Sequence, residues 1–224
     1  LSVGPHVKLS ASTAFASYWM VPRLQKFRED LPDIDLRIQT ADRDLDLIAE
    51  NIPLGVRAGA PEEFPLYDLV LLAPEEVYPV CSPSYAARHG TPQSVEALLS
   101  HRLIHLEEPY RPAVSWREWF GSAGVDGRRT PGGLQINDYV SVIQSTIEGQ
   151  GIALGWEHLT GGLIGSGHLV RLTDHVLSTG KSFYVASPKG VRLSPPAQAV
   201  RQWLSRQFRE AEARAHVVGR PGPL

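Results

Sequence analysis

The stretch LSASTAFASYWMVPRLQKF, residues 9–27, passes from an apolar strand pattern through two small hydroxyl residues into a helix pattern. We predict a strand over residues 7–11 and helical structure over residues 14–30. The helix is expected in two parts, because Pro22 disfavours helical geometry at Val21. A strand that leads directly into a helix is the repeating element of α/β folds.

Ser12 and Thr13 lie at this junction and allow two interpretations. The first backbone N–H groups of a helix lack partners within the helix, and the helix dipole adds partial positive charge there. With two hydroxyl groups as further donors, such a junction can bind a small anion. The same residues can also form an ordinary N-cap, worth about 1 kcal/mol. Both roles can coexist.

The rest of the chain alternates strand and helix patterns. We predict strands over residues 35–40, 54–57, 67–80 (two runs broken at 73–76), 102–105, 132–136, 151–156, 169–172 and 183–186, and helices over 42–50, 83–89, 94–101, 116–123, 139–148, 157–162 and 194–212. This alternation favours an α/β fold with largely parallel pairing. In such sheets ligands bind beyond the carboxyl ends of the strands.

Composition limits the classes of function. The 224 residues carry 22 Lys and Arg against 24 Asp and Glu, a net charge of −2, and no basic stripe is visible. The chain alone is therefore a poor candidate for direct DNA binding. The single cysteine, Cys81, excludes an internal disulfide and fits a reducing compartment. No apolar run reaches the roughly 20 residues of a membrane helix, so no membrane contact is expected.

A second junction repeats the order of strand, polar pair and helix at Ile136, Asn137, Asp138 and Tyr139. Asn137 or Asp138 caps the helix in one interpretation, and faces a ligand in the other. Further on, Trp156 ends a buried strand pattern and is either a pocket wall or a core residue. These alternatives stay open at the level of sequence.

Arg57 ends a short apolar strand pattern and precedes Ala58 and Gly59. A guanidinium at a strand end can bind a carboxylate in bidentate fashion. A structural ion pair with a nearby acid is the alternative, and we favour it slightly.

Catalytic patterns are not found. The eight histidines show no metal-ligand spacing, and no G-x-S-x-G motif occurs. Cys81 is interpreted as a buried, inert thiol, and Glu107 with Glu108 as a solvated loop pair. We therefore predict a protein that is not an enzyme and needs no cofactor or metal.

Six segments in order carry a family resemblance: SAST at 10–13, VPRL at 21–24, LPDIDL at 31–36, VRAG at 56–59, VCSPSY at 80–85 and GQGIAL at 149–154. Together they resemble the effector-binding region of LysR-type transcriptional regulators, over most of the chain. WREWF at 116–120 and ALG at 153–155 look most like the subgroup that contains glycine-cleavage and β-lactamase activators.

The resemblance implies a fold like that of type 2 periplasmic binding proteins, with two Rossmann-like lobes joined by two crossovers. Lobe I would comprise residues 1–79 and 174–224, and lobe II residues 80–173. The family's N-terminal winged helix-turn-helix is not among these residues. The effector would lie in the cleft between the lobes, with contacts from Ser12, Thr13, Arg57, Ala58, Gly59, Asn137, Asp138, Tyr139 and Trp156.

The implied function is that of a cytoplasmic, dimeric or tetrameric sensor of a small metabolite, which controls DNA binding by the missing N-terminal domain. Helix N-termini favour an anionic or zwitterionic effector. The aromatics Tyr18, Trp19, Tyr139 and Trp156 could cage a quaternary ammonium, so a betaine- or choline-like molecule is one hypothesis. The alternative is a solute-binding protein of a transporter, with the same fold and a similar cleft.

Overall fold

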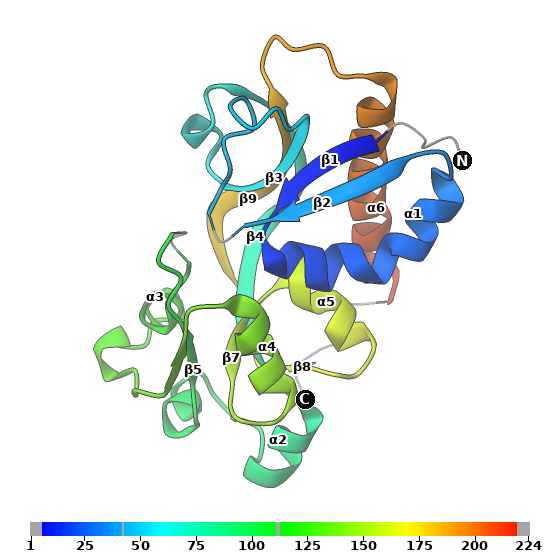
Figure 1. The fold of residues 1–224 in the computed structure, drawn as a ribbon. Coiled ribbons are helices and arrows are strands. Elements are labelled where there is room, and N and C mark those ends of the chain that lie inside the picture. The colour runs from blue at the N-terminus through cyan, green and yellow to red at the C-terminus, as the bar shows by residue number, and fades with distance from the viewer. Residues whose placement is uncertain (1–5, 42, 111–112, 219–224) are drawn as a thin grey trace. The chain divides into compact units, whose positions relative to one another are not determined.

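The computed structural model describes residues 6–41, 43–110 and 113–218, with side chains of the last helix described up to residue 211 and at 213 (Figure 1). The chain divides into two compact units. Unit 1 comprises Leu1–Glu75 and Gly180–Gly219, and the described part of unit 2 is Glu76–Thr179. Strands β4 (Tyr67–Cys81) and β9 (Leu177–Pro188) each run from one unit into the other.

The predicted lobe boundaries can be compared with this division. The boundary predicted at residues 79–80 lies within β4, as the division does. The boundary predicted at residues 173–174 lies before β9, whereas the division between the two units lies within β9, between Thr179 and Gly180.

Unit 1 is built on three parallel strands and the antiparallel β9. Strand β1 (His6–Ala11) lies between β2 (Asp35–Thr40) and β3 (Leu54–Gly59), and β3 continues to β9. The register pairs Leu9 with both Ile38 and Leu54. Because Leu9 is fully buried at the centre of this pairing, the apolar strand predicted over residues 7–11 is the core strand of the unit.

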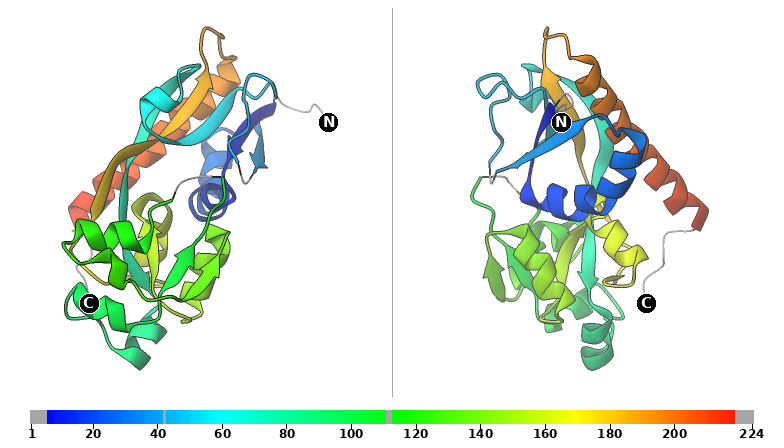
Figure 2. Two further views of the ribbon diagram at one scale, coloured as in Figure 1. Left: turned by 90° about the vertical axis from the view of Figure 1, so that its left-hand side faces the viewer. Right: turned by 45° about the vertical axis from the view of Figure 1, so that its right-hand side comes forward.

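Helical segments cover this sheet. The chain after β1 forms a π-helical turn over Phe15–Met20, a 3-10 turn over Val21–Arg23 and α1 over Leu24–Asp30, with a further 3-10 turn at Pro61–Glu63 and the closing helix α6 at Pro195–Val218. Figures 1 and 2 show α6 alongside the strands of unit 1, where it contacts β1.

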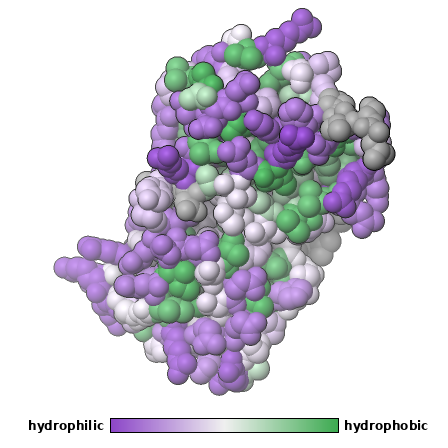
Figure 3. All heavy atoms as spheres, viewed as in Figure 1, coloured by the Kyte–Doolittle hydropathy of each residue, from purple (hydrophilic) through white to green (hydrophobic). Residues whose placement is uncertain are grey.

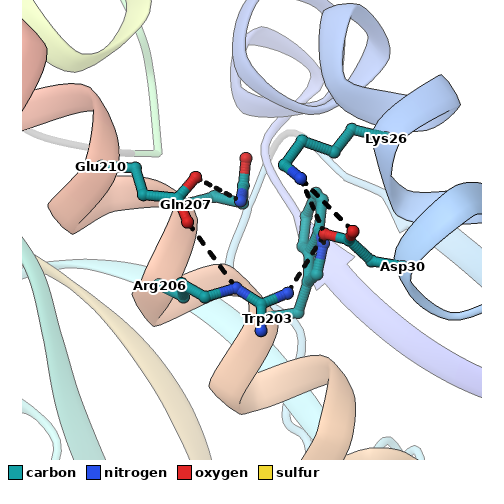
Figure 4. A network of polar contacts seen from close by, with 6 residues as sticks. All are labelled: Lys26, Asp30, Trp203, Arg206, Gln207 and Glu210. Carbon is teal, nitrogen blue, oxygen red and sulfur yellow. Dashed lines mark hydrogen bonds and ion pairs between the residues drawn. The ribbon is translucent and has the colours of Figure 1, made fainter.

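Aromatic stacking joins α6 to the helical segments after β1. The ring of Trp19 stacks on Phe208 with centroids 4.4 Å apart, and Phe27 meets Trp203 edge to face at 5.1 Å. The indole N–H of Trp203 also donates to Asp30 Oδ2 at 2.8 Å, within a polar network that includes Lys26, Arg206, Gln207 and Glu210 (Figure 4). These contacts anchor the end of the chain to its beginning inside unit 1.

Unit 2 contains the second half of β4 with β7 (Ala153–Trp156) and β8 (Val170–Arg171) antiparallel to it. Strands β5 (Ile104–Leu106) and β6 (Leu134–Ile136) pair in parallel. Its helices are α2 (Pro83–His89), α3 (Trp116–Ser122), α4 (Tyr139–Ile147) and α5 (Glu157–Gly165), with 3-10 turns at Glu96–Ser100 and Gly127–Arg129.

Two local predictions were wrong. The helix expected over residues 42–50 is reduced to a single turn over residues 47–50, which Asp46 caps by accepting from the N–H groups of Ile48 and Ala49. The turn ends at Asn51, whose φ of 50° is left-handed, and the N–H of Ile52 donates to the carbonyl of Leu47. The break expected in the strand at 73–76 does not occur, and β4 runs through Pro74. Proline is tolerated in a strand where no neighbour needs its missing N–H.

None of the described helices is both long and apolar enough to cross a membrane. Hydrophilic residues cover most of the face drawn in Figure 3, and the hydrophobic residues on it form small separate groups. Scattered exposed apolar side chains of this kind are normal on protein surfaces.

Candidate functional site

Three strand ends converge in unit 2. Leu106 at the end of β5 pairs with Ile136 at the end of β6, and the N–H of Glu107 donates to the carbonyl of Ile136 at 2.8 Å. Beside β5, the chain leading into β7 runs parallel, through a bridge between Leu103 and Ile152. The carboxyl ends of β5, β6 and β7 therefore meet at one edge, the position at which α/β sheets bind ligands.

A cavity of about 190 Å³ opens at this edge. Its walls come from the end of β5, the start of α3, helix α4 and strand β7, all within unit 2. The lining residues are Ile104, His105, Leu106, Glu107, Val114, Ser115, Trp116, Val142, Leu154 and Trp156. A mostly apolar wall with a few polar groups is typical of small-molecule sites.

The start of α3 is fixed against β5. The indole N–H of Trp116 donates to the carbonyl of Ile104 at 2.9 Å. Ser115 and Glu118 form a capping box, in which the hydroxyl of Ser115 accepts from the N–H of Glu118 and the carboxylate of Glu118 accepts from the N–H of Ser115. A capping box satisfies two otherwise free N–H groups, so this wall of the cavity is rigidly placed.

Tyr139 supports Trp156 from behind. The Tyr139 hydroxyl donates to the carbonyl of Leu154 and accepts from the N–H of Trp156, both at 3.2 Å. The two rings meet edge to face, with centroids 5.0 Å apart. Trp156 is thus both a core residue, at 6% exposure, and a lining residue of the cavity, whereas Tyr139 holds it in position.

The two polar residues before α4, Asn137 and Asp138, differ in their contacts. Asp138 caps the helix: its carboxylate accepts from the N–H of Ser141 at 2.8 Å, from the hydroxyl of Ser141 at 2.6 Å and from the N–H of Val140 at 3.4 Å. Two first-turn donors of α4, the N–H groups of Val140 and Ser141, are therefore already bound by a negative group. Asn137 is exposed and follows β6 directly, next to Glu107 in the register.

In unit 1, the junction after β1 also shows a cap. The hydroxyl of Ser12 accepts from the N–H of Phe15 at 3.1 Å, and its carbonyl accepts from the N–H of Ala16 at 3.0 Å. Ser12 is half-buried and Thr13 is exposed. The chain continues into the π-helical turn Phe15–Met20; such turns are rare and often occur at functional sites.

The side chain of Arg57 donates hydrogen bonds to backbone carbonyl groups of the same unit. The side chain is 2% exposed. Its guanidinium donates to the carbonyl of Val56 at 3.0 Å and of Leu45 at 2.6 Å, and lies 3.8 Å from the carboxylate of Asp44. These contacts fix the loop before Asp46 against β3, the structural role that we favoured. Of its neighbours in the sequence, Ala58 is exposed and Gly59 is buried.

Of the ten lining residues only Trp156 was among the predicted site residues; the polar or aromatic ones that were missed are His105, Glu107, Ser115 and Trp116. Glu107 was interpreted as a solvated loop acid, and it is indeed exposed in the loop after β5 while also lining the cavity. The signal that could have found it is its place directly after a strand pattern, the same signal that singled out Asn137. Among the described residues no cluster of His, Cys, Asp and Glu suits a metal ion.

Cys81 is buried, and burial raises the pKa of its thiol to about 12. A thiol with so high a pKa is a poor nucleophile at neutral pH, in keeping with the prediction of an inert residue.

The two α/β units and the cavity at parallel strand ends define the class: an α/β small-molecule-binding domain. The chain matches the model of the LysR substrate binding domain family over residues 2–209, and it belongs to that family. The resemblance found in the sequence is therefore confirmed.

Relatives support this family. The chain is 29% identical over 196 residues to the glycine cleavage system transcriptional activator of Escherichia coli (strain K12), covering 88% of this chain and 63% of the relative. It is 28% identical over 204 residues to the HTH-type transcriptional activator AmpR of Rhodobacter capsulatus, covering 91% and 67%. The chain thus spans about two thirds of the length of these regulators.

Solved structures show the fold. The effector domain of the transcriptional regulator AmpR of Pseudomonas aeruginosa superposes with a TM-score of 0.74 at 23% identity, covering 93% of this chain and 98% of that one. The CrgA regulatory domain of Neisseria meningitidis gives 0.73 at 19% identity, covering 92% and 99%. The predicted fold, α/β and like a type 2 periplasmic binding protein, is confirmed.

Proposed function

We propose that this chain is the effector-sensing part of a cytoplasmic LysR-type transcription factor, in which a bound metabolite controls DNA binding by an N-terminal winged helix-turn-helix. The observation that carries the proposal is the cavity at the ends of β5 and β7 in a chain of the LysR substrate-binding family. The net charge of −2 supports a division of labour in which another domain contacts DNA. The chain binds its ligand without catalysis.

The effector that we propose is anionic or zwitterionic, for example of the betaine or choline type. The proposed contacts are Ser12 and Thr13 in unit 1, and Asn137 and Trp156 in unit 2. Asp138, Tyr139 and Arg57 act through the groups they hold, and Arg57 supports Ala58 and Gly59 at the end of β3. Family members typically oligomerise, and we propose a dimer or tetramer.

For the ligand to act as a signal, it must bind one arrangement of the full-length protein better than another. The two affinities are then linked: the ligand changes the affinity for DNA by the same factor by which DNA changes the affinity for the ligand.

A thermal-shift screen tests ligand binding directly. Ligand at 100-fold over its Kd adds about 2.7 kcal/mol of stability, which for a chain of this size raises Tm by very roughly 5–10 °C. Amino acids, small carboxylates, and choline- and betaine-type compounds form the panel. Hits are then titrated into the full-length regulator bound to labelled promoter DNA, where we expect a change in DNA affinity.

The variants Ser12→Ala and Thr13→Ala examine the first junction. Loss of a hit in the folded variants supports a ligand contact there. Retention of the hit would make Ser12 a cap alone and remove both residues from the site. The function is refuted if no compound of any class stabilises the chain or alters DNA binding by the full-length protein.

A further inference from the structure

The ionisable groups that line the unit 2 cavity influence which charge a ligand can carry there. Among the described residues that line it, Glu107 is the one carboxylate, and there is no lysine or arginine. Asp138, which follows β6 in the chain, already binds two first-turn N–H groups of α4, those of Val140 and Ser141. An anion entering here would face a carboxylate and find those donors taken.

Most of the other polar groups that line the cavity already have hydrogen-bond partners within the chain. The Nε2 of His105 lies 3.1 Å from the carbonyl oxygen of Pro131. Because a carbonyl only accepts, Nε2 carries a proton and donates it to this hydrogen bond. The indole N–H of Trp116 is bound to Ile104, and the hydroxyl of Ser115 donates to Glu118 at 2.8 Å.

The remaining walls are apolar and aromatic. The side chains of Leu106, Val114, Val142 and Leu154 offer no hydrogen bonds, and Trp116 and Trp156, which also line the cavity, have electron-rich indole rings. The cavity has a volume of about 190 Å³. That space suits a compact group whose surface is apolar and whose charge is positive.

We propose that this cavity binds an alkylated ammonium group, the positively charged end of the effector. Glu107 is the counter-ion, the indoles of Trp116 and Trp156 attract the cation through their π-systems, and the aliphatic walls contact its N-alkyl groups. The inference rests on the proposed function and adds that the end of the ligand bound in this cavity is positively charged. The anionic end of a zwitterion is bound by donors outside this cavity.

Isothermal titration calorimetry with a pair of isosteres tests the charge. Choline and 3,3-dimethyl-1-butanol have nearly the same shape, and differ in a quaternary nitrogen against a quaternary carbon. We expect the chain to bind choline at least about tenfold more tightly than the neutral alcohol. Tetramethylammonium and glycine betaine extend the series.

Two variants locate the contact. Glu107→Gln keeps the size of the side chain and removes its charge, so we expect it to lose most of the preference for choline over the alcohol. Glu62→Gln, an exposed acid in unit 1, is the matched control and should keep that preference. Trp156→Phe retains an aromatic ring with a weaker π-system, and should reduce the preference less than Glu107→Gln does.

Several results would overturn the inference: equal affinity for choline and its neutral isostere, unchanged preference in folded Glu107→Gln, or no binding of any ammonium probe at about 10 mM. The isostere comparison needs no variant, so a folding defect in one leaves the test intact. If a carboxylate or neutral metabolite binds instead, the sensor function stands and this inference fails. If nothing of any class binds or alters DNA occupancy, the function itself fails.

Discussion

Replacement of Arg57 by methionine separates the two roles that a guanidinium at this position can have. The side chain is 2% exposed and donates to two carbonyl groups, those of Leu45 and Val56. Methionine preserves much of the length of the side chain and removes both donors. If the role is structural, the variant loses stability and the folded fraction keeps its affinity for ligand.

The size of the effect follows from these contacts. Each buried carbonyl left without a partner costs about 1–3 kcal/mol. The ion pair with Asp44 at 3.8 Å involves a partly exposed carboxylate, and adds about 0–1 kcal/mol. Removing a desolvated charge offsets part of this loss. We expect Arg57→Met to lower the free energy of unfolding by about 2–4 kcal/mol.

Urea unfolding followed by circular dichroism measures this change. The control is Arg37→Met in strand β2 of the same unit, where the arginine side chain is 53% exposed and pairs with Asp35. Substitution there should change stability by less than about 0.5 kcal/mol. If Arg57→Met were as stable as Arg37→Met but bound the effector more weakly, the structural reasoning would be refuted and the guanidinium would be a ligand contact.

Three further outcomes are expected. Trp203→Phe removes the bond from the indole to Asp30 and part of a buried ring, and should lower the free energy of unfolding by about 1–3 kcal/mol in urea titrations. Cys81 should resist a thiol reagent at pH 8 in the native chain and react fully in denaturant; rapid native reaction would contradict its burial. Hydrogen bonds to backbone N–H groups lower the pKa of Asp46, so its stabilising effect is present above the unfolded pKa near 3.8 and is lost as pH falls through the folded value. Asp46→Asn should therefore lose less stability than the wild-type chain between pH 5 and pH 3, and parallel curves would count against this.

Much of the fold was accessible from periodicity. The apolar positions of the closing helix, Val200, Trp203, Leu204 and Phe208, are all buried, because a helix in contact with a sheet repeats its apolar side chains every 3.6 residues. The strand before Ser12 was equally clear. Where prediction failed, over residues 43–50, the left-handed φ of Asn51 ends the helix after one turn, and the apolar periodicity does not encode that backbone conformation.

The cavity was less accessible, because its walls meet only through strand order. Glu107, Trp116 and Trp156 are far apart in sequence, and the parallel arrangement of β6, β5 and β7 brings them together. A polar residue after a strand pattern looks the same whether it caps a helix or faces a ligand. The structure distinguishes the two cases. The carboxylate of Asp138 accepts a hydrogen bond from the first turn of α4, whereas Glu107 lines the cavity. We base the proposed cation site on this difference, because Asp138 already binds two donors that would attract an anion and Glu107 supplies negative charge to the cavity.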